Sequence, residues 1–191
     1  MSILTETLPD FIVVKGQKCQ IKTDFKVWLE FSHIFSDEQI TPEKIIRIFT
    51  LMFFELPPNM LEAMNGLVSF FSHSQETKGT SSRKENKKET KKYYDFEYDA
   101  DLIFSGFYQQ YKIDLTESNM HWWKFKALLN GLSDETQFMK VVQYRCTDLS
   151  KIKDKEQKKF YSKMKVLYRL PDNRSVEQKE KSLNNAMESM F

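Results

Sequence analysis

The sequence predicts a mainly α-helical protein, a compact helical bundle with a small N-terminal β-hairpin and a disordered basic linker. Apolar residues recur at helical spacing over most of the 191 residues, and such a period is typical of amphipathic helices. Only 5 Gly and 5 Pro are present, too few turn residues for an all-β fold. The 16 Phe provide large side chains for the helices to bury.

The chain is predicted to begin with a hairpin and a first helix. Residues 10–22 contain two short β-type runs around Lys15-Gly16-Gln17, where Gly16 can adopt a positive φ at little cost. Asp24 is a suitable N-cap for the helix that follows. The apolar side of this helix is expected to contain Phe25, Trp28, Phe31 and Phe35.

Two more helices are expected before residue 73. Thr41-Pro42-Glu43 combines an N-cap hydroxyl, a proline in the first turn and an acid near the positive end of the helix dipole. Pro57-Pro58 is expected to end this helix and to open the next. The apolar positions are Ile45, Ile48, Phe49, Met52 and Phe53 in the first, and Leu61, Met64, Leu67, Val68 and Phe71 in the second.

Residues 74–93 are predicted to be a flexible charged linker, because no large apolar residue occurs between Ser74 and Lys92. Such a basic linker most often keeps two parts soluble, although it can also contact nucleic acid or an acidic partner. The net charge alternates along the chain, being −3 over 1–73, +4 over 74–94, −4 over 95–150 and +5 over 151–191. The hairpin and helices of 1–73 and the helical region 94–170 can still pack as one domain.

Two helices are predicted after the linker. The first has an apolar stripe, and its start is rich in acids, as the helix dipole favours: Asp95, Glu97, Asp99 and Asp101. The second is apolar on two sides and includes Trp122 and Trp123. Neighbours on a helix lie about 100° apart, so both tryptophans cannot share a face. We expect Trp123 in the core and Trp122 nearer a partner surface.

The rest of the chain is predicted to be helical up to Pro171. Gly131 is a candidate C-cap, and Ser133-Asp134-Glu135 is expected to start the next helix. A Lys-rich helix follows, with Phe160, Met164 and Leu167 predicted to face inward. The tail 171–191 is expected to form at most a marginal amphipathic helix.

No catalytic residue, cofactor-binding residue or metal ligand is predicted, and we expect the protein not to be an enzyme. None of the 3 His lies at ligand spacing from another His, a Cys or a suitable acid pair, and His121 is expected to be a hydrogen-bonded or surface imidazole. Cys19 and Cys146 are isolated thiols. The acids at 95–101 lack the glycine and the glutamate of a calcium-binding loop. Phosphate-binding loops and nucleophile motifs are missing too.

Neither a membrane nor a nucleic acid is an expected partner. The N-terminus lacks the pattern of a signal peptide, and the longest apolar run, near Leu51–Phe54, is far shorter than the ~20 residues that span a bilayer. Residues 151–169 are basic and contain Tyr161 and Tyr168, but arginine is scarce and no DNA- or RNA-binding motif occurs. A solvated helix face explains these lysines better, and a nucleic-acid-binding regulator remains a distant alternative.

Residues 94–170 resemble a bacteriophage protein family encoded beside the tape-measure gene in long-tailed phages of Gram-positive bacteria. Three segments carry the resemblance: DFEYDADLIFSGFYQQYKIDL at 95–115, MHWWKFKALLNGL at 120–132 and FMKVVQYR at 138–145. The resemblance implies a tail assembly chaperone that binds the tape-measure protein, assists the tail tube protein and works in the host cytoplasm. Such a protein is expected to be absent from the mature virion.

The resemblance implies no binding residues, so candidates come from the sequence pattern alone. Helical clients require apolar grooves, and methionines, of which this chain has 9, adapt to varied apolar segments, although they can equally be ordinary core residues. The predicted partner-binding residues are Trp122, Tyr108, Met187 and Met190, and self-association is a further expectation. The main alternative is a structural virion component such as a head–tail connector or tail-terminator subunit.

Overall fold

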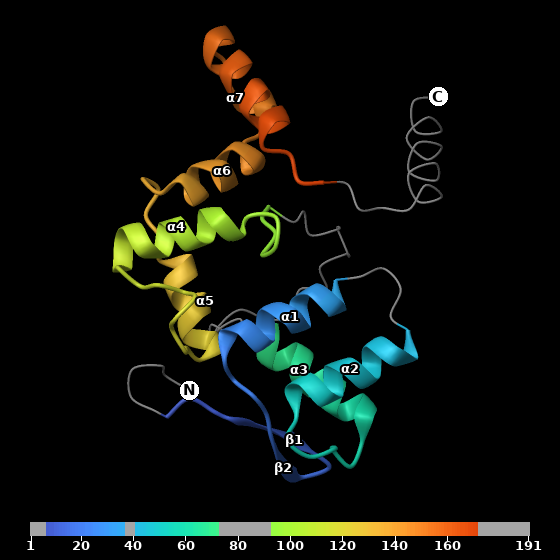
Figure 1. Cartoon of the computed structure of the whole chain (residues 1–191). Helices are drawn as coiled ribbons and strands as arrows, with labels where there is room; N and C mark the ends of the chain where they lie inside the picture. The colour runs from blue at the N-terminus through green and yellow to red at the C-terminus, as the bar shows by residue number, and fades with distance from the viewer. Residues whose placement is uncertain (1–6, 37–40, 73–92, 172–191) are drawn as a thin grey trace, which may run out of the picture.

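A computed structural model describes residues 7–36, 41–72 and 93–171 (Figure 1). The helices are α1 (Phe25–Phe35), α2 (Pro42–Met52), α3 (Met60–Ser72), α4 (Ala100–Tyr111), α5 (Trp122–Asn130), α6 (Gln137–Cys146) and α7 (Lys155–Leu167), with a 3-10 turn η1 (Leu149–Lys151). Strands β1 (Phe11–Val14) and β2 (Gln17–Gln20) form an antiparallel hairpin. The predicted fold class, mainly α with an N-terminal hairpin, is confirmed. Apart from Tyr93, the predicted linker at 74–93 lies outside the described residues, as does the tail beyond Pro171.

The hairpin turns at Lys15 and Gly16, whose φ values are 49° and 75°. Glycine adopts this left-handed conformation without steric cost, which explains its place in the turn. Strand alternation directs Ile12 and Val14 into the core and leaves Val13 54% exposed. Helix α3 packs closely on this face at Gly66, where a Cβ atom would lie only 2.8 Å from the Ile12 side chain.

At most helix starts, the side chain of the N-cap residue accepts a hydrogen bond from a free backbone N–H group in the first turn. The sequence predicts two of these N-caps, Asp24 and Thr41. Asp24 accepts from the Lys26 N–H at 2.9 Å, and Thr41 accepts from the Lys44 N–H at 3.4 Å. The predicted starts of α3 and α6 are wrong by a few residues. Asn59 and Thr136 cap these helices instead, because their side chains reach the N–H groups three residues later.

One hydrophobic cluster contains buried residues from both sides of the gap between 72 and 93. Its centre is aromatic: Trp28 of α1 stacks on Phe70 of α3 at 4.9 Å between ring centroids. Trp122 of α5 stacks on Phe71 at 5.0 Å and lies 6.2 Å from Trp28. Helices α1, α3 and α5 therefore meet around these rings, and Figure 1 shows α5 against the end of α1.

Helix α5 also caps the C-terminal end of α3. The indole N–H of Trp122 donates to the Phe71 carbonyl at 3.1 Å, and that of Trp123 donates to the Phe70 carbonyl at 3.0 Å. Lys126 Nζ donates to the Phe71 and Ser72 carbonyls at 3.0 and 2.7 Å. The last carbonyl groups of a helix have no hydrogen-bond partner within the helix, and burying them unpaired would be costly. The side chains of Trp122, Trp123 and Lys126 supply the missing donors.

The structure corrects two predicted helix faces. In α3 the buried residues are Ala63, Leu67 and Phe70, whereas Leu61 is 75% exposed, so the face is rotated from the predicted one. In α7 no residue is buried. Its Phe160 and Leu167 are 48% and 62% exposed, because among the described elements the helix packs mainly on α6 and η1 and lies at the end of the molecule opposite the hairpin (Figure 1).

Candidate interaction surface

An open groove of about 570 Å³ lies beside α2 and the loop that leads to α3. The volume suits several apolar side chains of a partner, since binding pockets in proteins usually measure ~300–1,000 Å³. Its lining is mainly apolar: Lys22, Ile46, Phe49, Thr50, Phe53, Phe54, Glu55, Leu56 and Met60.

The groove forms because the chain leaves α2 in an extended conformation. Phe53, with φ −107° and ψ 153°, forms an antiparallel bridge with Ile21 and is buried. Successive side chains of an extended segment point to opposite sides, so Phe54 faces outward and is 67% exposed. Pro57 and Pro58 interrupt any helix here. This local backbone therefore keeps apolar side chains out of the core.

Five large apolar side chains are exposed between residues 46 and 61, and we call them the α2–α3 apolar surface. They are Ile46 (62% exposed), Phe54 (67%), Leu56 (75%), Met60 (47%) and Leu61 (75%). Single exposed apolar residues are ordinary, but a concentration around a groove is typical of an interaction site. The floor beneath them is buried, since Phe49 and Phe53 are 2% and 5% exposed.

The polar margin of the groove has one cation and one acid, Lys22 and Glu55. Lys22 Nζ donates to the Thr50 carbonyl at 3.4 Å and lies 5.8 Å from the centre of the Phe54 ring. A cation at that distance from an aromatic face is weakly attracted to it and helps to hold the ring in place. The rest of the lining is mainly apolar, which suits contact with apolar side chains.

Of the predicted partner-binding residues, the two that the structure describes, Trp122 and Tyr108, do not line this groove. Trp123 is buried (9% exposed), as expected, but Trp122 has no exposed surface, so the expectation that it lies nearer a partner surface is wrong. Both are buried because their indole N–H groups reach carbonyls of α3, and Trp122 cannot contact a partner in this conformation. Tyr108 is 53% exposed on α4, where it stacks on Phe104. Met187 and Met190 lie outside the described residues.

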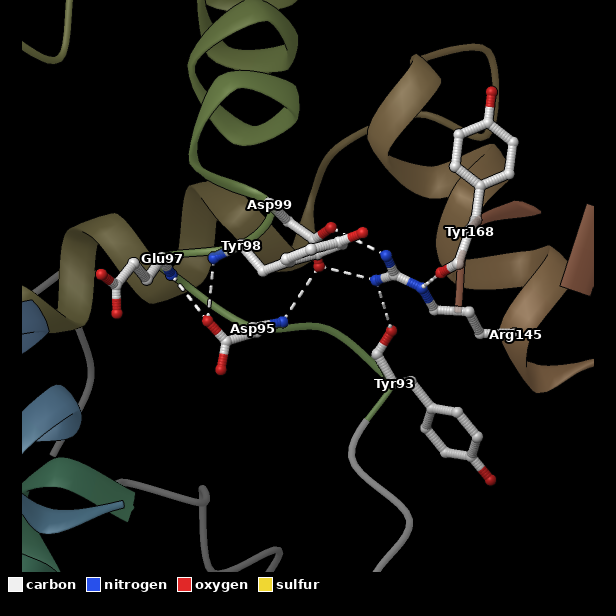
Figure 2. Close-up of polar contacts among 7 residues, drawn as sticks. All are labelled: Tyr93, Asp95, Glu97, Tyr98, Asp99, Arg145 and Tyr168. Carbon is white, nitrogen blue, oxygen red and sulfur yellow. Dashed lines mark hydrogen bonds and ion pairs between the residues drawn. The ribbon is translucent and has the colours of Figure 1, made fainter. Parts of the chain in front are cut away.

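Sequence reasoning missed both the α2–α3 apolar surface and an ion pair between Asp99 and Arg145. Figure 2 shows the Arg145 guanidinium against the Asp99 carboxylate, with Nη1–Oδ2 and Nη2–Oδ1 distances of 2.6 and 2.8 Å. Arg145 also donates to the carbonyls of Tyr168 and Tyr93, at 2.6 and 3.1 Å. The Asp95 N–H donates to Asp99 Oδ2 at 3.0 Å, so Asp99 does more than place charge at a helix start.

This ion pair joins segments that are distant in the sequence. It connects α6 with the start of α4, with the end of α7 and with the chain just after the gap at 73–92. The side chains of Arg145 and Asp99 are only 7% and 1% exposed. A guanidinium stays protonated at physiological pH, and a carboxylate with this little exposed surface meets no substrate. We therefore assign the pair a structural role.

Two further groups with shifted pKa values, His121 and Cys146, have structural surroundings as well. Burial, followed by the charge of Lys124, lowers the pKa of His121, which accepts from the Trp123 N–H at 3.1 Å and contacts the Pro9 carbonyl at 3.0 Å. His121 is thus a hydrogen-bonded imidazole, as expected, and it also caps the start of α5, which was not predicted. Burial raises the pKa of the Cys146 thiol, which disfavours the reactive thiolate.

Neither a metal-binding cluster nor a spanning helix is found in the ranges that the structure covers. Among residues 7–36, 41–72 and 93–171, no three His, Cys, Asp or Glu side chains lie close enough together to hold a metal ion. In the same ranges, every helix is too short or too polar to cross a bilayer.

The chain matches a family model described as Bacteriophage Gp15 protein over residues 4–170. The matched span includes the three segments that carry the phage resemblance, together with the hairpin, α1, α2 and α3. Searches of curated proteins and of solved structures found no match. Because the family model covers most of the sequence, the chain belongs to the bacteriophage Gp15 protein family.

Proposed function

We propose that this protein is a non-catalytic tail assembly chaperone of a bacteriophage, which binds the tape-measure protein and assists assembly of the tail tube. It acts in the host cytoplasm, associates with the tape-measure protein and the tail tube protein, and leaves before the virion is complete. The proposal rests on membership of a phage protein family and on the α2–α3 apolar surface.

The α2–α3 apolar surface is the observation that supports this function. An amphipathic helix binds in an apolar groove through side chains spaced at i, i+3 or i+4 and i+7. The groove beside α2 is large enough for such side chains, and Phe54 and Leu56 at its edge are exposed in the free protein. Because the margin has one cation and one acid, recognition depends on apolar contact and tolerates varied client sequences.

Coexpression with a fragment of the tape-measure protein tests the proposal. The fragment is expected to be soluble and to copurify with the wild-type chain. The double variant Phe54→Ser/Leu56→Ser should lose this effect while remaining folded. Tyr98→Ser is the matched control, because Tyr98 is 55% exposed and does not line the groove. A fragment that stays insoluble with the wild-type chain contradicts the proposal.

Mass spectrometry of purified particles distinguishes the chaperone from a structural virion component such as a connector or tail-terminator subunit. An assembly chaperone is present in infected-cell lysate and missing from mature particles. A stoichiometric amount in mature particles would overturn the chaperone function and support the structural alternative.

A further inference from the structure

We propose that the exposed face of α7 is a second docking surface, which binds an acidic amphipathic helix of a partner protein. This surface is separate from the α2–α3 apolar surface, and the proposal does not depend on client binding there. We define the α7 face by Lys155, Lys159, Phe160, Lys163, Val166 and Leu167, all of which are exposed.

Helix α7 contributes no buried side chain to the fold. It is attached to α6 through Tyr144, whose ring lies 6.0 Å from those of Phe160 and Tyr161. Arg145 also donates to the Tyr168 carbonyl at the end of α7. A 13-residue helix is marginal in water without packing, and these contacts occupy only one of its sides. Within the part of the chain that the structure describes, the other side of α7 is exposed, and Phe160, which contacts Tyr144 yet is 48% exposed, lies at the border between the two sides.

The free side of α7 combines apolar groups with lysines. Phe160, Lys163 and Leu167 follow one another at i, i+3 and i+7, which places them in one row along the helix. Lys159 and Val166 lie beside that row at i and i+7. Phe160 and Leu167 in the row are 48% and 62% exposed, and Val166 beside it is 75% exposed, so another helix can cover these apolar side chains.

The charge of α7 determines the chemistry of the partner. The helix has five lysines and one acid, Glu156. A partner helix with apolar residues on one side and Asp or Glu at its flanks matches both the stripe and the lysines. A second α7 is disfavoured because like charges would meet. Nucleic acid would use the lysines but leave the stripe of Phe160 and Leu167 unused.

Peptide binding to the full-length protein tests the inference. The probes are fluorescent 18-residue amphipathic helices of Leu and Ala with Glu at the polar positions, and a matched peptide with Lys in place of Glu. We expect anisotropy to show saturable binding of the acidic peptide only. Lys159→Glu/Lys163→Glu and Phe160→Ser/Leu167→Ser should each weaken binding at least about tenfold. Phe54→Ser/Leu56→Ser should leave binding unchanged, which separates this surface from the proposed client groove.

Four results would overturn the inference. If the wild-type protein binds the acidic and the basic peptide equally, the lysines of this face do not select the partner. If both α7 double variants bind the acidic peptide as tightly as wild type does, the face is not the binding site. A DNA duplex that binds wild type and Phe160→Ser/Leu167→Ser equally, but not the lysine variant, assigns α7 to nucleic acid. A wild-type dimer that becomes monomeric in Phe160→Ser/Leu167→Ser shows that a second copy covers the face. Circular dichroism confirms that the variants, all at exposed positions, retain the fold.

Discussion

Arg145 and Asp99 form a bidentate ion pair with almost no exposed surface, although 46 positions separate them in the sequence (Figure 2). Removing both charges from water is costly, but every oxygen of the carboxylate has a partner. The pair also fixes the Tyr93 and Tyr168 carbonyls. The ion pair and its hydrogen bonds therefore hold the start of α4, α6 and the end of α7 together.

Asp99→Asn should lower the free energy of unfolding by about 3–5 kcal/mol, because Arg145 would keep a buried charge without its counter-ion. Urea denaturation followed by circular dichroism measures this difference. Asp101→Asn is the matched control, since Asp101 is exposed on the same helix and should change stability by less than about 0.5 kcal/mol. Equal effects of the two substitutions would contradict the structural role of the pair.

Trp123→Phe should destabilise the protein by about 1–3 kcal/mol, because the Phe70 carbonyl loses the indole N–H that caps α3. Thermal or urea unfolding gives the value. Tyr98→Phe, an exposed aromatic change, is expected to be neutral. A neutral Trp123→Phe would show that this hydrogen bond does not contribute to the attachment of α5 to α3.

His121 should make stability depend on pH. Burial lowers its pKa below the ordinary value of 6.5, so the unfolded chain binds the proton more tightly than the folded one. Stability is therefore complete above pH 6.5 and falls as the pH decreases from 6.5 through the lower folded pKa. Protonation also removes the lone pair with which Nδ1 accepts from the Trp123 N–H.

Unfolding free energies between pH 5.5 and 7.5 test this dependence. His121→Asn retains a capping acceptor without the titration, so its stability should vary less with pH. An identical slope in His121→Asn and wild type would show that His121 does not titrate in this way.

The α2–α3 apolar surface should be dispensable for folding. Phe54→Ser/Leu56→Ser is expected to change the free energy of unfolding by less than about 1 kcal/mol, because both side chains are mostly exposed. Phe49→Ala, in the buried floor of the groove, should cost about 3–5 kcal/mol. A large loss of stability in the double variant would mean that these side chains belong to the core.

Local signals predicted the parts of the fold that depend on neighbouring residues. Asp24 and Thr41 cap their helices as the sequence indicates, and Gly16 turns the hairpin. Contacts between distant residues were not predictable in this way. The burial of Trp122 depends on the Phe71 carbonyl, and the partner of Asp99 lies on another helix.

The two exposed apolar surfaces were missed for a similar reason. Phe54 and Leu56 read as ordinary apolar residues, and their exposure follows only from the extended backbone between Met52 and Met60. Likewise, the spacing of Phe160 and Leu167 predicts that α7 has an apolar face. The spacing does not indicate whether other parts of the protein bury that face.

Binding of a purified tape-measure fragment tests the central claim most directly. Isothermal titration calorimetry should show that the wild-type chain and Tyr98→Ser bind the fragment with equal affinity. Phe54→Ser/Leu56→Ser should bind at least about tenfold more weakly, because the partner loses two apolar contacts in the groove. Equal affinity of the groove variant and wild type, or no binding by wild type, would contradict a chaperone that holds its client at the α2–α3 apolar surface.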